Sequence, residues 1–306
     1  MRVTLIENFR AVFYAPFYAP IALGAYEAEG LQVDLKMSGD AAHTAASLIA
    51  GDGDVAWGGP LRLMFALEKN PGAGAVAFCE AVGRDPFFLL AREPNPGFQL
   101  TDLLGKKVAT VSEVPTPWMC LQQDLRLAGI APEKIQRIPE RSMAENVAAL
   151  RSGEADVIQV FHPFGGRLVY EGAAHVWYAA ANRGVVSYTT LNTTREFAER
   201  NPEVLLKMCR AMYRTLEWIG AHDGRELAEL LASYLPDVPP PILTTCFRNY
   251  QSLGLWNRTP ILQREGFEWL RDAALSAGLL RTQFSYEDCV DMRFAEAAVA
   301  ADPPSL

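Results

Sequence analysis

Residues 1–40, MRVTLIENFRAVFYAPFYAPIALGAYEAEGLQVDLKMSGD, decide the fold. Residues 3–6 form a short apolar run that is typical of a buried strand. The apolar spacing from Pro20 onward predicts a helix, which we expect to end at Gly30. Residues 31–35 then alternate between apolar and polar side chains, as in a second strand. The stretch therefore predicts a β-α-β unit that opens an α/β protein.

The loop between this first strand and the helix, residues 7–17, holds more aromatic rings than a turn requires. In open α/β sheets, ligands bind beyond the carboxyl ends of the strands, and this loop leaves such an end. The rings either pack on the sheet as core or surround a flat, partly apolar ligand together with nearby hydrogen-bonding groups. The ligand contacts expected here are Glu7, Asn8, Phe13, Tyr14 and Phe17.

Composition limits the classes of function. The 306 residues leave room for two domains of about 150 residues each. Half of the residues are apolar (50%) and 21% are charged, which indicates a globular chain. The net charge of −8 and the absence of any block of Lys or Arg argue against a nucleic-acid partner. No apolar run reaches the roughly 18 residues that would indicate a membrane span.

The five cysteines are scattered, with neither a CxxC pair nor a tight Cys/His cluster. We therefore expect buried thiols, no disulfide framework, no metal site and no cofactor. The first strand begins almost at once, without a basic segment or an A-x-A cleavage site. The protein is accordingly expected to be cytoplasmic if the chain is complete as given, and periplasmic if an export signal has been removed.

An internal repeat indicates two similar lobes. Leu48-x-x-Gly51-x-x-Asp54-Val55 is matched by Leu150-x-x-Gly153-x-x-Asp156-Val157, and a proline follows each copy. Both copies predict a helix, a glycine stop, an acidic residue and a buried strand. Their separation of about a hundred residues is that of a domain, far above the period of a solenoid. Beyond residue 194 the pattern becomes mostly helical.

Several motifs together carry a family resemblance: residues 28–33 (AEGLQV), 51–56 (GDGDVA), 102–108 (DLLGKKV), 153–157 (GEADV) and 196–203, which open with EF and close with NPE. In order and spacing the chain resembles the substrate-binding proteins of nitrate/sulfonate/taurine-type ABC transporters, which are grouped with the thiamine-pyrimidine precursor synthases. The resemblance implies a periplasmic-binding-protein-like fold of type II, with two α/β lobes, a two-strand hinge and a ligand cleft. Lobe I would comprise residues 1–86 and 188–306, and lobe II residues 87–187.

Some relatives implied by this resemblance are enzymes. The precursor synthases carry a lysine and a histidine after the third strand and a cysteine-rich stretch near the second crossover. Here residues 58–62 read GGPLR and residues 183–188 read RGVVSY, without any of these groups. Sulfinate desulfinases of this fold need a cysteine in the first-strand loop, which also has none. The alternative that stays open is a cytoplasmic lyase, hydrolase or precursor-synthase-like enzyme, with His162 as general acid or base beside Glu7 or Glu113.

Further candidate contacts lie at predicted strand ends and helix starts. Free backbone N–H groups at a helix start can hold an anion, although ordinary turn chemistry explains the same residues. In lobe I these are Ser38, Gly39, Asp40, Gly58, Gly59 and Pro60. The stiff proline-containing loop of lobe II adds Glu113, Thr116 and Trp118.

The remaining candidates lie at a strand end of lobe II and at the two crossovers. Phe161 and His162 follow a predicted strand and should face the cleft, although a single histidine is commonly structural. Arg84 could grip a carboxylate or sulfonate with both arms of its guanidinium, and Tyr188 lies at the second crossover; hinge hydrogen bonding is the alternative for both. The sequence thus predicts a solute-binding protein that captures a small organic ligand, preferably aromatic or heteroaromatic, for delivery to an ABC permease.

Overall fold

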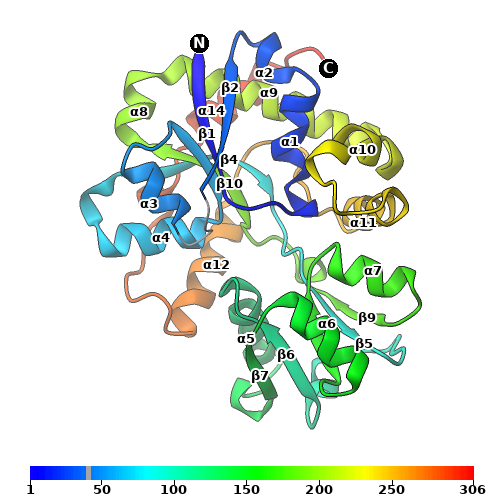
Figure 1. The fold of residues 1–306 in the computed structure, drawn as a ribbon. Helices are drawn as coiled ribbons and strands as arrows, with labels where there is room; N and C mark the ends of the chain where they lie inside the picture. Colours follow the sequence, from blue (N-terminus) through cyan, green and yellow to red (C-terminus); the bar gives the residue numbers. More distant parts are fainter. Residues whose placement is uncertain (39–42) are drawn as a thin grey trace.

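The computed structural model describes residues 1–38 and 43–306, which form two α/β lobes (Figure 1). The first sheet has the strand order β2-β1-β3-β10-β4. In it β1 is parallel to β2 and β3, whereas β10 is antiparallel to β3 and β4. Its strands are β1 (Arg2–Glu7), β2 (Gln32–Met37), β3 (Val55–Gly58), β4 (Ala75–Val82) and β10 (Thr189–Thr194).

The second sheet repeats this plan in the order β7-β6-β8-β5-β9. Here β6 is parallel to β7 and β8, and β5 is antiparallel to β8 and β9. In each sheet, the strand that arrives from the other lobe is therefore the fourth in order and runs antiparallel to its neighbours. The strands are β5 (Phe88–Ala91), β6 (Lys107–Val111), β7 (Gln136–Arg141), β8 (Val157–Val160) and β9 (His175–Ala179). The two predicted lobes of similar construction are confirmed.

The two copies of the sequence repeat have the same local structure. Gly51 and Gly153 end their helices with φ of 83° and 81°, a region that favours glycine. Asp54 then accepts a hydrogen bond from the backbone N–H of Thr4 at 2.8 Å, and Asp156 accepts one from Lys107 at 2.8 Å. Each carboxylate thus fastens the start of its own strand to the neighbouring parallel strand, which explains why both copies need an acidic residue.

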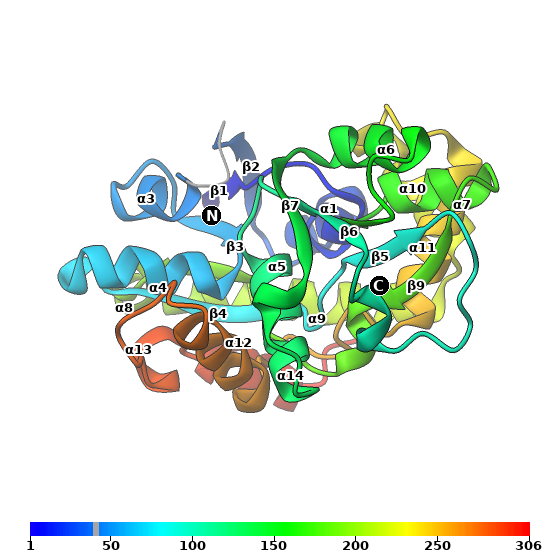
Figure 2. The same ribbon diagram turned by 90° about the horizontal axis from the view of Figure 1, so that it is seen from below.

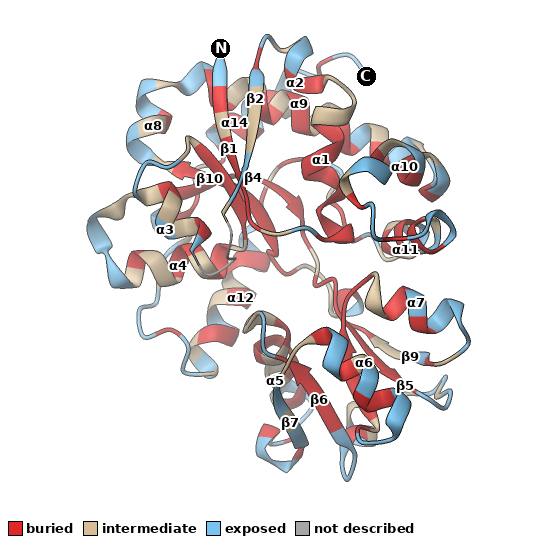
Figure 3. Cartoon of the chain, viewed as in Figure 1, coloured by how far each residue is buried: buried red, intermediate tan, exposed pale blue. Residues whose placement is uncertain are grey.

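Helices cover both faces of each sheet, and the apolar side chains between them are buried (Figure 3). Lobe II carries α5 (Thr116–Leu127), α6 (Met143–Ser152) and α7 (Phe164–Tyr170). Lobe I carries α1 (Ala15–Ala22), α2 (Ala25–Ala28), α3 (Thr44–Ile49), α4 (Pro60–Lys69), α8 (Arg195–Arg200), α9 (Pro202–Ala221), α10 (Gly224–Leu231), α11 (Pro240–Ser252), α12 (Arg264–Ser276), α13 (Tyr286–Cys289) and α14 (Arg293–Ala300). Across residues 1–38 and 43–306, no helix has both the length and the apolar character needed to cross a bilayer.

Two predicted helices differ from those observed. The helix expected from Pro20 already begins at Ala15, so Phe17 lies in α1 and not in a loop. Residues 15–20 are buried all round, which hides the one-sided spacing that normally reveals a helix. Within the mostly helical region predicted beyond residue 194, we expect one helix over residues 286–300. It is divided into α13 and α14, because Val290 leaves the helix to form a bridge with Ala77 of β4.

The two crossovers are residues 83–87, between β4 and β5, and residues 180–188, between β9 and β10. They lie side by side between the lobes (Figure 1), and Figure 2 shows the molecule from below, with lobe II in front. Val186 donates its backbone N–H to Gly83 at 3.0 Å, and Tyr188 donates to Val82 at 3.0 Å. The buried Arg183 pairs with Asp85 of the first crossover at 2.7 Å and also with Asp124 of α5. Sheet membership follows the predicted two-lobe division, whose exact boundaries at residues 86 and 188 stay a prediction.

Candidate functional site

A cavity of about 660 Å³, here called the outer chamber, opens between the lobes. Lobe I contributes residues 9–12 after β1 and residues 234–238 between α10 and α11. Lobe II contributes Glu113 and Val114 after β6, Met143 at the start of α6, and Phe161, Pro163 and Phe164 after β8. The volume is in the range of sites that enclose a small organic molecule, and the walls are mainly apolar.

A second, much smaller space adjoins the outer chamber on the side of the crossovers. This inner chamber has a volume of about 30 Å³, enough for one water molecule or a small group of atoms. It shares Phe9, Val114 and Phe161 with the outer chamber, so the two spaces adjoin. The remaining residues of its wall are Asn8, Phe13, Tyr14, Gly59, Leu61, Arg62, Phe87, Thr116 and Tyr188.

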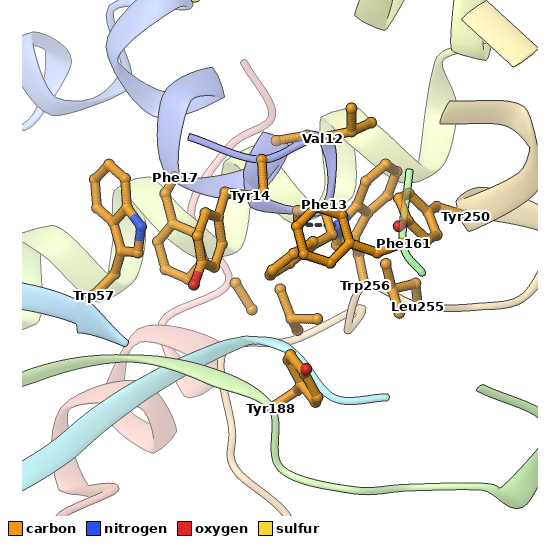
Figure 4. Close-up of a cluster of buried hydrophobic side chains, with 14 of the residues drawn as sticks. Val12, Phe13, Tyr14, Phe17, Trp57, Phe161, Tyr188, Tyr250, Leu255 and Trp256 are labelled. Carbon is orange, nitrogen blue, oxygen red and sulfur yellow. Dashed lines mark hydrogen bonds between the residues drawn. The ribbon is translucent and has the colours of Figure 1, made fainter. Parts of the chain in front are cut away.

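The aromatic residues of the first loop form a packed wall (Figure 4). Phe13 is 1% exposed, and its ring lies 5.2 Å from that of Phe161 in lobe II and 5.9 Å from that of Tyr188. Its carbonyl oxygen accepts a hydrogen bond from Trp256 Nε1 at 2.9 Å. Phe17 stacks on Trp57 and lines neither chamber. The predicted ring cluster exists, but most of it is core that shapes the site.

Phe9 differs from its neighbours because it is only partly buried and lines both chambers. Its ring stacks at 6.3 Å on Phe161, which comes from the other lobe. Phe9 belongs to the aromatic loop of residues 7–17 but was not among the predicted ligand contacts. The available signal was its position two residues beyond Glu7, the last residue of β1.

The polar groups at the end of β1 are held by neighbouring side chains. Asn8 donates from Nδ2 to the Tyr14 hydroxyl at 3.0 Å and accepts from Thr44 at 2.8 Å. Burial raises the pKa of Tyr14 well above its ordinary value, and the positive charge of Arg62 opposes this rise, so Tyr14 stays a neutral hydroxyl. The Glu7 carboxylate accepts from Tyr18 at 2.8 Å and lines neither chamber.

Some of the helix-start residues predicted in lobe I form hydrogen bonds within the lobe, and others line the inner chamber. Ser38 donates to the Asn8 carbonyl oxygen at 3.3 Å, while Gly39 and Asp40 lie outside the described residues. The Gly58 carbonyl oxygen accepts hydrogen bonds from Thr190 and Asn192.

Gly59 lines the inner chamber, and a Cβ there would lie 3.1 Å from the carbonyl oxygen of Tyr188, so a larger residue would press on the second crossover. Pro60 then begins α4, and Arg62 in its first turn also lines the inner chamber. Sequence reasoning did not select Arg62, although a basic residue in the helix turn that follows a strand end is a recognisable signal.

In lobe II the three contacts predicted in the proline-containing loop border three different spaces. Glu113 lines the outer chamber, and its carboxylate accepts the N–H of Met143 at 2.8 Å, which caps the start of α6. Thr116, the first residue of α5, lines the inner chamber. Trp118 lines neither; it packs under the Arg137 guanidinium at 4.7 Å and borders a different cavity of about 420 Å³.

Phe161 and His162 point to different surroundings, as successive residues after a strand do. Phe161 lines both chambers. His162 is buried between Phe88 and Tyr250 and shares a hydrogen bond of 2.9 Å between Nε2 and Asn249. Burial lowers the pKa of His162 to about 4, so its ring is neutral near pH 7. A general acid or base at this position would not face the cavity.

The two predicted contacts at the crossovers, Tyr188 and Arg84, also have different surroundings. Tyr188 lines the inner chamber, and burial raises the pKa of its hydroxyl well above the ordinary value. Arg84 lines neither chamber and donates from Nη1 to the carbonyl oxygen of Ala181 at 3.0 Å. It therefore ties one crossover to the other, as the hinge alternative expected. Residues 234–238 also line the outer chamber, and no local sequence pattern indicated this contribution.

Comparisons with known proteins agree with this architecture. The profile of the family described as "NMT1/THI5 like" matches residues 13–225. The Bacillus subtilis (strain 168) protein named "Putative binding protein YtlA" is 24% identical over 297 residues, which cover 96% of this chain and 89% of that protein.

Solved structures with the same fold include a binding protein and an enzyme. The periplasmic aliphatic sulphonate binding protein SsuA from Escherichia coli superimposes with a TM-score of 0.73 at 17% identity, covering 94% of this chain and 95% of that chain. The desulfurization enzyme DSZB superimposes with a TM-score of 0.70 at 15% identity, covering 99% of each chain.

Proposed function

Because the chain belongs to the NMT1/THI5-like family, we propose that it is a solute-binding protein that holds a small organic ligand between its two lobes. The observation that carries this proposal is the pair of adjoining inner and outer chambers, whose walls come from both lobes. A ligand in this position bridges the lobes and favours their closed arrangement. The likeness to the aliphatic sulphonate binding protein supports binding as the role of the scaffold.

The walls also suggest a ligand class. The inner chamber offers Arg62, the Tyr14 and Tyr188 hydroxyls, and the first turns of α4 and α5, which carry partial positive charge. Its small volume admits only a compact head group. The outer chamber has room for a ring or chain against apolar walls. We therefore propose a ligand with a compact hydrogen-bond-accepting head, such as a carboxylate or sulfonate, and an apolar or aromatic body.

Binding is favoured over catalysis by the placement of the candidate acid–base groups. His162 is directed into the protein, and Glu7 lines neither chamber. Glu113 does line the outer chamber, but its carboxylate already accepts the N–H of Met143. A nucleophile–base pair that meets at the cavity would be needed for the hydrolase or lyase alternative.

A thermal-shift screen of carboxylates, sulfonates, pyrimidines and amines tests the proposal. A ligand at a hundred times its dissociation constant should stabilise the fold by about 2.7 kcal/mol. Phe9→Ala should lose the shift, because this ring lines both chambers. Phe65→Ala is the matched control, since Phe65 is also a partly buried phenylalanine but lies on α4 outside the chambers. Equal loss of the shift in both variants, or turnover of the best hit, would contradict capture at this site.

We also propose that the loaded protein delivers its ligand to an ABC permease in the periplasm. The resemblance to ABC-transporter binding proteins and the periplasmic sulphonate-binding neighbour support this partner and this location. The experiment is ATP hydrolysis by a reconstituted permease from the same genome. The ligand-loaded protein should stimulate hydrolysis more than the empty protein, and equal rates with both would contradict delivery.

A further inference from the structure

A third space, here called the side chamber, adjoins the outer chamber at the edge of lobe II. It has a volume of about 420 Å³ and lies between α6, α7 and the loop before α11. It shares Pro163, Phe164, Asp237 and Val238 with the outer chamber, so the two spaces adjoin. The outer chamber thus adjoins both other spaces, the inner chamber on the side of the crossovers and the side chamber along α6 and α7.

The walls of the side chamber are mainly apolar. Leu168 of α7 is 1% exposed and Val238 is 9% exposed, while Phe164 and Val147 are partly buried. An apolar surface that adjoins a ligand cavity gains free energy when an apolar group replaces water on it. Two guanidinium groups lie among the lining residues: Arg151, which pairs with Glu171, and the exposed Arg167.

We infer that the side chamber binds the distal apolar end of an elongated amphiphilic ligand whose polar head occupies the inner chamber. The inner chamber is too small for a ring, which places the bulk of any ligand in the outer chamber. A short ligand would be covered there, and the apolar walls of the adjoining side chamber would stay in water. A longer chain reaches those walls and gains burial without disturbing its head group.

This inference rests on the proposed function and adds a length preference to it. Each methylene that becomes buried should tighten the dissociation constant about fourfold, as hydrocarbon transfer from water predicts. A ligand limited to the outer chamber would instead reach constant affinity once that chamber is filled.

The experiment is calorimetric titration with two homologous series, butyrate to decanoate and butanesulfonate to decanesulfonate. Affinity should continue to rise to the longest members in at least one series. Ala144→Phe places a ring in the side chamber from an exposed position on α6, and it should weaken the longest probes by at least about tenfold while leaving the butyl probes unchanged. Ala148→Phe, an exposed position on the same helix outside the chambers, is the matched control and should bind all probes as the parent does.

The outcomes separate this inference from the function on which it rests. Two results would overturn the side-chamber assignment and leave ligand capture standing. In the first, short probes bind but affinity stops rising at the hexyl member. In the second, Ala144→Phe and Ala148→Phe bind all probes equally. Failure of every member of both series to bind would overturn the amphiphile class and this inference together. The wider thermal-shift screen then decides capture itself.

Discussion

Glu80 gives the sharpest prediction, because the structure places a carboxyl group in the core beside the crossovers. It lies on β4 with no exposed surface, where the Ser187 hydroxyl donates to one oxygen and Asn257 Nδ2 donates to the other at 2.8 Å. Burial raises the pKa of Glu80 from 4.5 to about 7, and the two hydrogen bonds only partly oppose the rise.

The sign of the resulting pH dependence follows from linkage. Between pH 4.5 and 7 the folded chain retains a proton on Glu80 that the unfolded chain has lost. The stability associated with this proton is fully present below pH 4.5 and is lost as the pH rises through about 7. The difference between the unfolded and folded pKa values corresponds to about 3 kcal/mol of unfolding free energy.

Glu80→Gln removes the ionisation and keeps the shape of the side chain. Its amide has one acceptor oxygen and one donor group, as the protonated carboxyl group does. Chemical denaturation of the parent and the variant should be followed from pH 4.5 to 8. The free energy of unfolding of the parent relative to the variant should fall by about 3 kcal/mol over this range. A difference that is independent of pH, or one that rises with pH, would refute the reasoning about this buried carboxyl group.

Three further perturbations test the packing around the site. His162→Gln should remove a pH dependence of the opposite sign, because burial lowers the pKa of His162 from 6.5 to about 4. As the pH falls through this range, the free energy of unfolding of the parent should fall by about 3 kcal/mol relative to that of the variant. Parallel pH profiles of the two proteins would contradict the burial of this ring. Phe13→Ala should lower the free energy of unfolding by about 3–4 kcal/mol, and Phe9→Ala should lower it by less than half as much, because Phe9 is only partly buried. Equal losses of unfolding free energy, measured by chemical denaturation, would show that Phe9 is also a core residue. Arg183→Met should lower the free energy of unfolding by about 3–5 kcal/mol, because it leaves two buried carboxylates without their cation. Adding Asp85→Asn and Asp124→Asn should restore most of this loss. If the melting temperature did not recover, the electrostatic explanation would be contradicted.

Much of the fold was predictable because several strands, such as β3 and β8, are short apolar runs that follow a glycine and an acidic residue. The repeat around Gly51 and Gly153 revealed two similar lobes, since each copy needs the same left-handed helix end and the same carboxylate on a neighbouring backbone N–H. The start of α1 was missed for the converse reason. A helix buried on every side loses the one-sided pattern from which helices are recognised.

The site was predictable to the level of loops but not of individual side chains. Thr116 and Trp118 lie in the same loop-to-helix segment, yet only Thr116 reaches the cavity, because the exact start of α5 decides which side chains turn inward. Phe161 and His162 differ in the same way after β8. The loop at residues 234–238 joins the wall only through the tertiary packing of α10 and α11, which no local pattern encodes.

The crystal structure of the complex with the strongest hit from the thermal-shift screen tests the central claim most directly. The account predicts that the ligand lies between the lobes, with its head group within hydrogen-bonding distance of the inner-chamber residues and its body in contact with Phe9 of one lobe and Phe161 of the other. A ligand that contacts a single lobe, or that binds outside these chambers while they stay empty, would contradict it.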